Sequence, residues 1–145
     1  MFKKTLITVA MVSLVCYLGC GDTTGDPITV TPPIDEAPLT KDDSVVANCY
    51  LVRDAVEAFA AANGGEYPVV IWYEETPDGR TTLDFLPGGE LLVNPFTGLR
   101  TEPTPATAAN IGQTGYMSVR PDHYIINGIG SDWPDELIIL TTESP

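Results

Sequence analysis

The sequence predicts an α+β domain in which one N-terminal α-helix packs on an antiparallel β-sheet, with a long connecting loop between them. Three observations support this fold class. Apolar residues recur every three or four positions from residue 45 to residue 59, which is the period of a helix. Three runs rich in β-branched and aromatic residues follow one another at 115–119, 123–129 and 136–141. Between these two parts, residues 86–105 are rich in proline and glycine, as loops are.

We expect the helix to run from about residue 41 to residue 63. Its apolar stripe consists of Val45, Cys49, Val52, Val56 and Phe59. Thr40, followed three residues later by Asp43, resembles a capping box at the start, and the Asn63-Gly64-Gly65 run accepts the left-handed backbone that ends a helix. Glu57 lies outside the stripe, so we expect its replacement by alanine to be nearly silent.

The region after the helix has weaker signals. Val69–Tyr73 is a short apolar run typical of a buried strand, and Thr81–Leu86 is expected to return as a second, weaker strand. The proline-rich and glycine-rich region that follows needs apolar anchors, for which Leu91, Leu92, Val93 and Phe96 are the candidates. Short connections between the last three runs favour an antiparallel meander.

Residues 1–19 read as an export signal. Two lysines precede roughly fourteen mostly apolar residues, too few for a membrane span of about twenty. The segment ends in Tyr17-Leu18-Gly19-Cys20, which resembles the lipobox of bacterial lipoproteins. The resemblance implies that Cys20 is lipidated and becomes the first residue of an exported protein, anchored on the periplasmic or outer side of the envelope. Free secretion and retention as a short anchor are the alternatives.

Residues 20–40 form a Pro/Thr-rich acidic tether without helical or strand periodicity, and residues 41–145 form the folded domain. After residue 19, five Lys and Arg residues stand against twenty Asp and Glu residues, a formal charge of −15. Such a surface repels phosphate backbones and anionic headgroups. We therefore expect no nucleic-acid binding, and we expect the lipid anchor to provide the contact with the membrane.

The sequence offers little for catalysis. Once Cys16 leaves with the signal and Cys20 carries lipid, Cys49 remains alone on the apolar stripe, where a buried structural thiol is favoured over a reactive one. His123 is the only histidine and has no nucleophile motif to serve, so a surface or structural role is favoured over a general base. Glu74 and Glu75 read as solvated loop charges. We expect no enzyme activity.

Several motifs together resemble the globular head of type II secretion pseudopilins, the major pseudopilin group in particular. They are Asn48, the helix through Ala55 and Phe59, and the segments 63–68, 86–89, 94–98, 112–116 and 124–128. The resemblance covers roughly residues 44–142 and implies a pilin-head fold. Pseudopilins begin with a prepilin leader and a long apolar helix, whereas this chain has a lipobox and a proline-rich tether. We therefore expect a pilin-like head on a lipid anchor.

Two functions follow as expectations. The first is a protein-interaction or structural module linked to type II secretion or a pilus-like assembly, with an envelope or secretion-machinery protein as partner. The alternative is an envelope lipoprotein that binds a ligand or an ion. The resemblance implies a calcium site in the loop 128–136, where Ser131, Asp132 and Asp135 could supply oxygen ligands, although an ordinary acidic turn explains the same residues.

Overall fold

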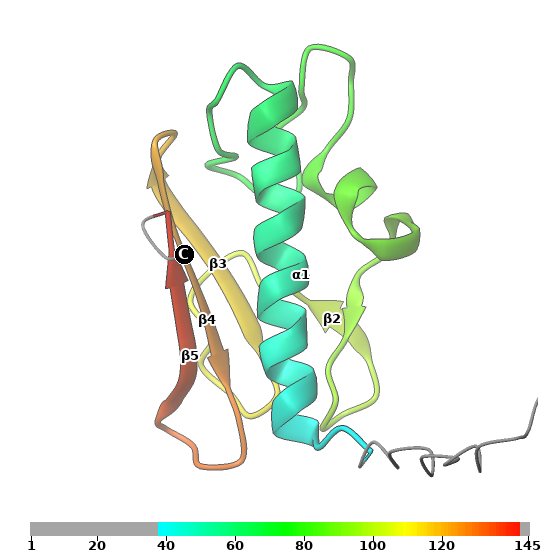
Figure 1. Cartoon of the computed structure of the whole chain (residues 1–145), viewed down its shortest axis with the longest axis vertical. Coiled ribbons are helices and arrows are strands. Elements are labelled where there is room, and N and C mark those ends of the chain that lie inside the picture. Colours follow the sequence, from blue (N-terminus) through cyan, green and yellow to red (C-terminus); the bar gives the residue numbers. More distant parts are fainter. Residues whose placement is uncertain (1–37, 143–145) are drawn as a thin grey trace, which may run out of the picture. The chain divides into compact units, whose positions relative to one another are not determined.

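The computed structural model describes residues 38–142, so the predicted export signal, Cys20 and most of the tether lie outside the described residues. The described part is α+β, with one α-helix and antiparallel sheets, as predicted. Helix α1 (Lys41–Ala62) runs between a three-stranded sheet on one side and an irregular region on the other (Figure 1). The sheet consists of β3 (Thr114–Arg120), β4 (His123–Ile129) and β5 (Glu136–Thr141).

Helix α1 begins and ends where the sequence predicts. The Thr40 hydroxyl accepts from the Asp43 N–H at 3.1 Å while the Asp43 carboxylate accepts from the Thr40 N–H at 2.9 Å, which completes a capping box. At the other end the Gly65 N–H donates to the Ala60 carbonyl at 2.8 Å, and Gly64 has a φ of 72°. Within residues 38–142, no helix is both long enough and apolar enough to cross a bilayer.

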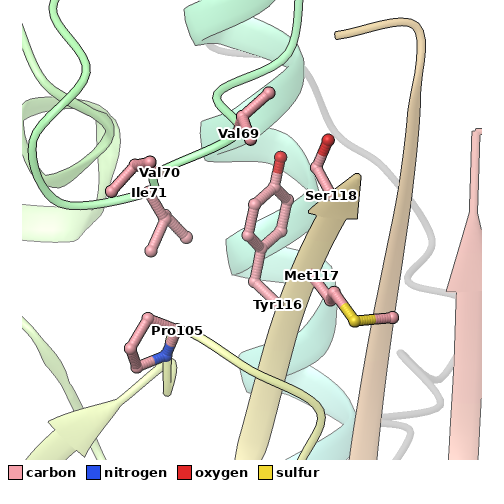
Figure 2. A pocket seen from close by; sticks show the side chains of 7 residues that line it. All are labelled: Val69, Val70, Ile71, Pro105, Tyr116, Met117 and Ser118. Carbon is pink, nitrogen blue, oxygen red and sulfur yellow. The ribbon is translucent and has the colours of Figure 1, made fainter. Parts of the chain in front are cut away.

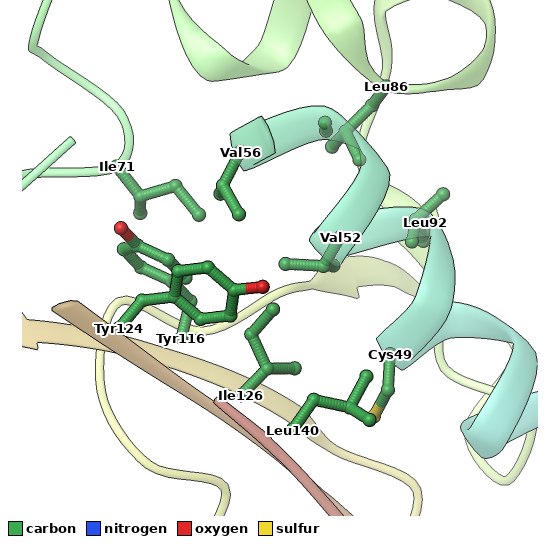
Figure 3. Packing of buried hydrophobic residues seen from close by; sticks show 11 residues of the cluster. Cys49, Val52, Val56, Ile71, Leu86, Leu92, Tyr116, Tyr124, Ile126 and Leu140 are labelled. Atoms are coloured by element: carbon green, nitrogen blue, oxygen red, sulfur yellow. The ribbon is translucent and has the colours of Figure 1, made fainter. Parts of the chain in front are cut away.

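The core lies between α1 and the sheet. The five stripe residues of α1 are fully buried, which confirms the helical period as the packing face. Three of them, Cys49, Val52 and Val56, meet Tyr116 of β3, Tyr124 and Ile126 of β4 and Leu140 of β5 in one cluster, which Ile71, Leu86 and Leu92 complete (Figure 3). Strands β3, β4 and β5 pair antiparallel in chain order, as the predicted meander requires. The close packing extends to Gly128, where an added Cβ would lie 2.7 Å from Val45 and 2.8 Å from the Cys49 sulfur.

The irregular region, residues 63–113, differs from the prediction in both proposed strands. Residues 69–73 form bends and turns. Ile71 is buried in the core and Trp72 packs against it, while Tyr73 is 83% exposed. Residues 82–85 form a 3₁₀-helix, η1 (Thr82–Phe85), followed by η2 (Pro87–Gly89). Both predictions were wrong because local capping prevailed over β propensity. Glu74 accepts from the Val69 N–H at 2.7 Å, and Asp84 accepts from the Thr81 N–H at 2.7 Å.

A two-stranded hairpin, β1 (Leu92–Val93) with β2 (Arg100–Glu102), completes the irregular region. Of the four predicted anchors, Leu92 is buried, Leu91 and Phe96 are half-buried, and Val93 is exposed. The hairpin is joined to α1 by a polar contact, because the buried Asn48 amide donates to the Val93 carbonyl at 2.9 Å. Glu102, fully buried, accepts from the Thr114 N–H at 2.8 Å and so connects β2 to β3.

Candidate functional site

The free edge of strand β5 is the first candidate site. β5 has β4 on one side, and within residues 38–142 no strand pairs with it on the other. The opposite edge of the sheet is different, because Thr104 bridges to Gly115 and covers the start of β3. Natural proteins usually protect such an edge with charges, prolines or covering segments. β5 instead reads Glu-Leu-Ile-Ile-Leu-Thr, with its single charge at the first position.

Side chains on β5 alternate between the core and the outside. Leu140 is buried and Ile138 packs against the core, so Ile139 faces away from α1 and is 53% exposed. Its direct neighbour on that outer face is the buried polar residue Asn127. Further along the face lie Met117 and Ile125, which are half-buried, and Val119, which is exposed. The outer face beside the free edge therefore combines apolar side chains with one buried polar side chain, and the described chain covers it only partly.

An acidic pocket of about 180 Å³ lies where β5 begins. It is lined by Asp42, Gly130, Ser131, Asp132, Asp135, Glu136 and Leu137. The loop is tied to the start of α1, because the Ser131 N–H and hydroxyl donate to the two Asp42 carboxylate oxygens at 2.9 and 2.7 Å. Gly130 permits this approach, since an added Cβ would lie 2.7 Å from an Asp42 oxygen.

The structure brings the three predicted calcium ligands, Ser131, Asp132 and Asp135, to this pocket together with Asp42. The sequence prediction did not include Asp42, which lies in the first turn of α1. Within residues 38–142, no group of three or more His, Cys, Asp and Glu side chains is arranged to hold a metal ion. Calcium binding stays a prediction.

An apolar pocket of about 190 Å³ lies at the other end of the sheet, beside β3 (Figure 2). Its lining comes from the turn at Val69–Ile71, from Pro105, and from Tyr116, Met117 and Ser118 of β3. The Tyr116 hydroxyl donates to the Pro68 carbonyl at 2.6 Å, so this polar group is already satisfied within the protein. Burial raises the pKa of Tyr116 above its ordinary value, and the phenol stays neutral at physiological pH. The pocket offers a shallow apolar contact and no free reactive group.

Glu57, expected to be silent when replaced, has two hydrogen-bond partners that the sequence did not indicate. Although exposed, its carboxylate accepts from the Tyr67 hydroxyl at 3.1 Å and from the buried Tyr124 hydroxyl at 2.9 Å. Burial and the hydrogen bond to this carboxylate both raise the pKa of Tyr124. The Tyr67 and Tyr124 rings meet edge to face at 4.8 Å between centroids. The cluster ties the end of α1 to the turn after it and to β4.

The remaining residues considered for chemistry have structural partners. Cys49 is buried, and burial raises the pKa of its thiol to about 12, so the reactive thiolate is scarce at neutral pH. His123 begins β4, and its Nδ1 lies 2.9 Å from the Thr142 hydroxyl. The sequence suggested that Glu74 is a solvated loop charge. Glu74 is instead half-buried, and its carboxylate caps a turn.

Comparisons of the sequence with family models and with curated proteins, and of the fold with solved structures, find no match.

Proposed function

We propose that this chain is a lipid-anchored protein of the bacterial envelope whose head, residues 41–145, binds another envelope protein through the free edge of β5. The observation that carries the proposal is the combination of a strand edge with which no other strand of residues 38–142 pairs and the exposed apolar side chain of Ile139. Main-chain groups on such an edge bind an added strand, and the neighbouring side chains select it. The role is one of binding rather than catalysis.

The resemblance to the major pseudopilin head selects the partners to be examined first. A long helix packed on an antiparallel meander is compatible with a pilin-like head, and the lipobox at Cys20 supplies the anchor. We therefore propose a component of a type II secretion system or a pilus-like assembly as the partner. Anchoring is stable when several acyl chains insert, since each buried methylene contributes about 0.8 kcal/mol.

The partner is tested by affinity purification of the tagged full-length protein from its own envelope. We expect a co-purifying protein that is lost in Ile139→Asp and retained in Tyr73→Asp, since both side chains are exposed but only Ile139 lies on β5. Measurement of the melting temperatures checks that both variants are folded. A partner retained equally by both variants contradicts the role of the edge, and the absence of any partner contradicts the interaction module.

The anchor is tested separately, by metabolic labelling with a fatty-acid analogue. We expect label in the wild-type protein and none in Cys20→Ala, with Cys49→Ala as the matched cysteine control that keeps its label. Label that persists in Cys20→Ala contradicts the assignment of this residue.

Calcium binding is a second candidate function, because the three predicted ligands and Asp42 line one pocket. Isothermal titration of the chelator-treated protein with calcium tests it. Binding heat that disappears in Asp132→Ala supports the site, whereas no heat at millimolar calcium leaves an ordinary acidic turn.

A further inference from the structure

We propose that the partner contributes an extended, basic segment that adds to β5 as a fourth strand, with a Lys or Arg side chain at the acidic pocket. This inference rests on the proposed function and deepens it by naming the chemistry of the partner. Three features of the described residues carry it: the direction of the β5 backbone groups, the position of the pocket on the strand, and the distribution of charge.

The first feature is the direction of the backbone groups. The Tyr116 N–H donates to the Thr104 carbonyl at 3.0 Å, so the main-chain groups of Tyr116 point away from β4. Opposed residues of antiparallel strands alternately point their main-chain N–H and C=O groups toward each other and away. The main-chain groups of Ile126 therefore point toward β5, where its register partner is Leu140. The main-chain N–H and C=O of Ile139, one residue before Leu140, therefore point away from β4, outward from the edge of the sheet. They are a donor and an acceptor for an incoming strand.

The second feature is the position of the acidic pocket. Glu136 and Leu137 are the first two residues of β5 and also line the pocket, so the free edge leads directly into it. A segment paired along Ile139 therefore has one end beside Asp132 and Asp135. The register shift of β4 and β5 between Gly128 and Ile129 adds a residue to β5 near this point, and such irregularities redirect side chains at strand ends.

The third feature is the distribution of charge, which indicates what kind of segment binds at the edge and the pocket. Among the described residues, the arginines pair with Asp54, Asp78, Glu90 and Asp122. The four carboxylates of the pocket have no such ion pair, and its lining contains no basic side chain. Lys41, next to Asp42 in sequence, lies with its ammonium 5.1 Å from the centre of the Phe96 ring. Local charge therefore favours a cation from outside.

A second copy of this chain is a poor occupant. Residues 41–145 contain sixteen acidic and five basic residues, so each head has a formal charge of −11 and two heads repel each other. A basic strand gains main-chain hydrogen bonds from the edge and charge pairing from the pocket. The exposed side chain of Ile139 offers an apolar contact to the alternate, uncharged side chains of the same strand.

The test is fluorescence anisotropy with the full-length protein, purified in mild detergent, and two labelled peptides. The basic probe is Lys-Val-Lys-Val-Lys-Val-Lys, and the control replaces every lysine with glutamate. We expect saturable binding of the basic probe only, weakening as salt is added. Ile139→Pro, which removes the outward N–H and adds a ring at the edge, should weaken binding about tenfold. Ile139→Thr, which keeps the N–H and suits a strand, should weaken it less.

The pocket is tested by the double substitution Asp132→Asn and Asp135→Asn, with Asp54→Asn as the control for a loss of charge elsewhere. We expect weaker binding of the basic probe in the double variant and unchanged binding in the control. Equal binding of both probes, or binding unaffected by Ile139→Pro, overturns the basic-strand proposal. If the envelope partner still depends on Ile139 in the purification experiment, the proposed function stands and only the chemistry of the partner is wrong.

Discussion

The two sides of α1 are held together by different kinds of interaction. On the sheet side, the helix stripe and alternate residues of β3 to β5 bury apolar side chains against one another. On the irregular side, Ile71, Leu86 and Leu92 join the same core, and single polar side chains in addition bind the backbone. Their contacts are Asn48 to Val93, Glu74 to Val69, Asn94 to Phe96 and Thr97, Glu102 to Thr114, and Gln113 to Ala109 and Asn110. Apolar contact needs a repeated pattern, whereas a side-chain cap needs only one residue in the right place.

The largest expected effect is in the core. Phe59→Ala should lower the free energy of unfolding by about 3–5 kcal/mol, because Phe59 is fully buried, packs edge to face on Phe85 of η1, and leaves a large cavity when it is truncated. Tyr73→Ala, the matched aromatic truncation on the irregular side, should change it by less than about 0.5 kcal/mol because Tyr73 is exposed. Urea denaturation of the two variants checks the pair, and similar losses in both contradict this description of the core.

The next effect tests the polar side. Glu102→Gln should lower the free energy of unfolding by about 1–3 kcal/mol, because an amide cannot accept from all three donors that Glu102 satisfies. These donors are the Asn94 amide, the Thr101 hydroxyl and the Thr114 N–H. Glu90→Gln is the control, since Glu90 is exposed at the surface of the same region. A Glu102→Gln variant as stable as the control shows that the buried carboxylate does not hold β2 to β3.

A smaller effect is expected where the two sides meet. Glu57→Ala should cost about 1–2 kcal/mol, because the Tyr67 and Tyr124 hydroxyls lose their shared acceptor but can still turn to water. Asp54→Ala, the control, removes a nearby acid that pairs with its sequence neighbour, Arg53. Thermal unfolding of both variants measures the difference. Equal melting temperatures of the two variants would show that replacing Glu57 by alanine hardly changes the stability, as the sequence suggested.

The smallest effect near neutral pH is that of Cys49. Its ordinary pKa is 9.0 and burial raises it to about 12, so the folded state holds the proton more tightly than the unfolded state. That contribution is complete below pH 9 and is lost as the pH rises toward 12. The melting temperature should fall above pH 9, and less steeply in Cys49→Ala. Parallel curves for the wild type and the variant exclude Cys49 as a source of the alkaline sensitivity.

Prediction from the sequence succeeded for α1 and the sheet and failed for the strands proposed in the irregular region. The bounds of α1, its capping box, its buried stripe and the meander were all predicted, because each depends on a repeated or well-known local pattern. The proposed strands at 69–73 and 81–86 were wrong, because Glu74 and Asp84 bind backbone N–H groups there and favour turns. β propensity alone does not register such contacts.

The candidate site shows the same limit. The sequence placed Ser131, Asp132 and Asp135 in one loop, but not Asp42, which is 89 residues from Ser131 in the chain and reaches the pocket only through folding. Strand β5 was predicted, yet its free edge depends on which strands become neighbours. The sequence of β5 is apolar from Leu137 to Leu140 and does not alternate, so only the structure identifies Ile139 as an outer residue.

The most direct test of the proposed function places a photo-crosslinking amino acid at position 139 and, in a second strain, at position 73 in living cells. Both positions are exposed, but only 139 lies on the free edge. We predict one specific crosslinked protein from position 139, identified by mass spectrometry as an envelope protein, and none from position 73. No crosslink from position 139, or the same products from both positions, contradicts partner binding at β5.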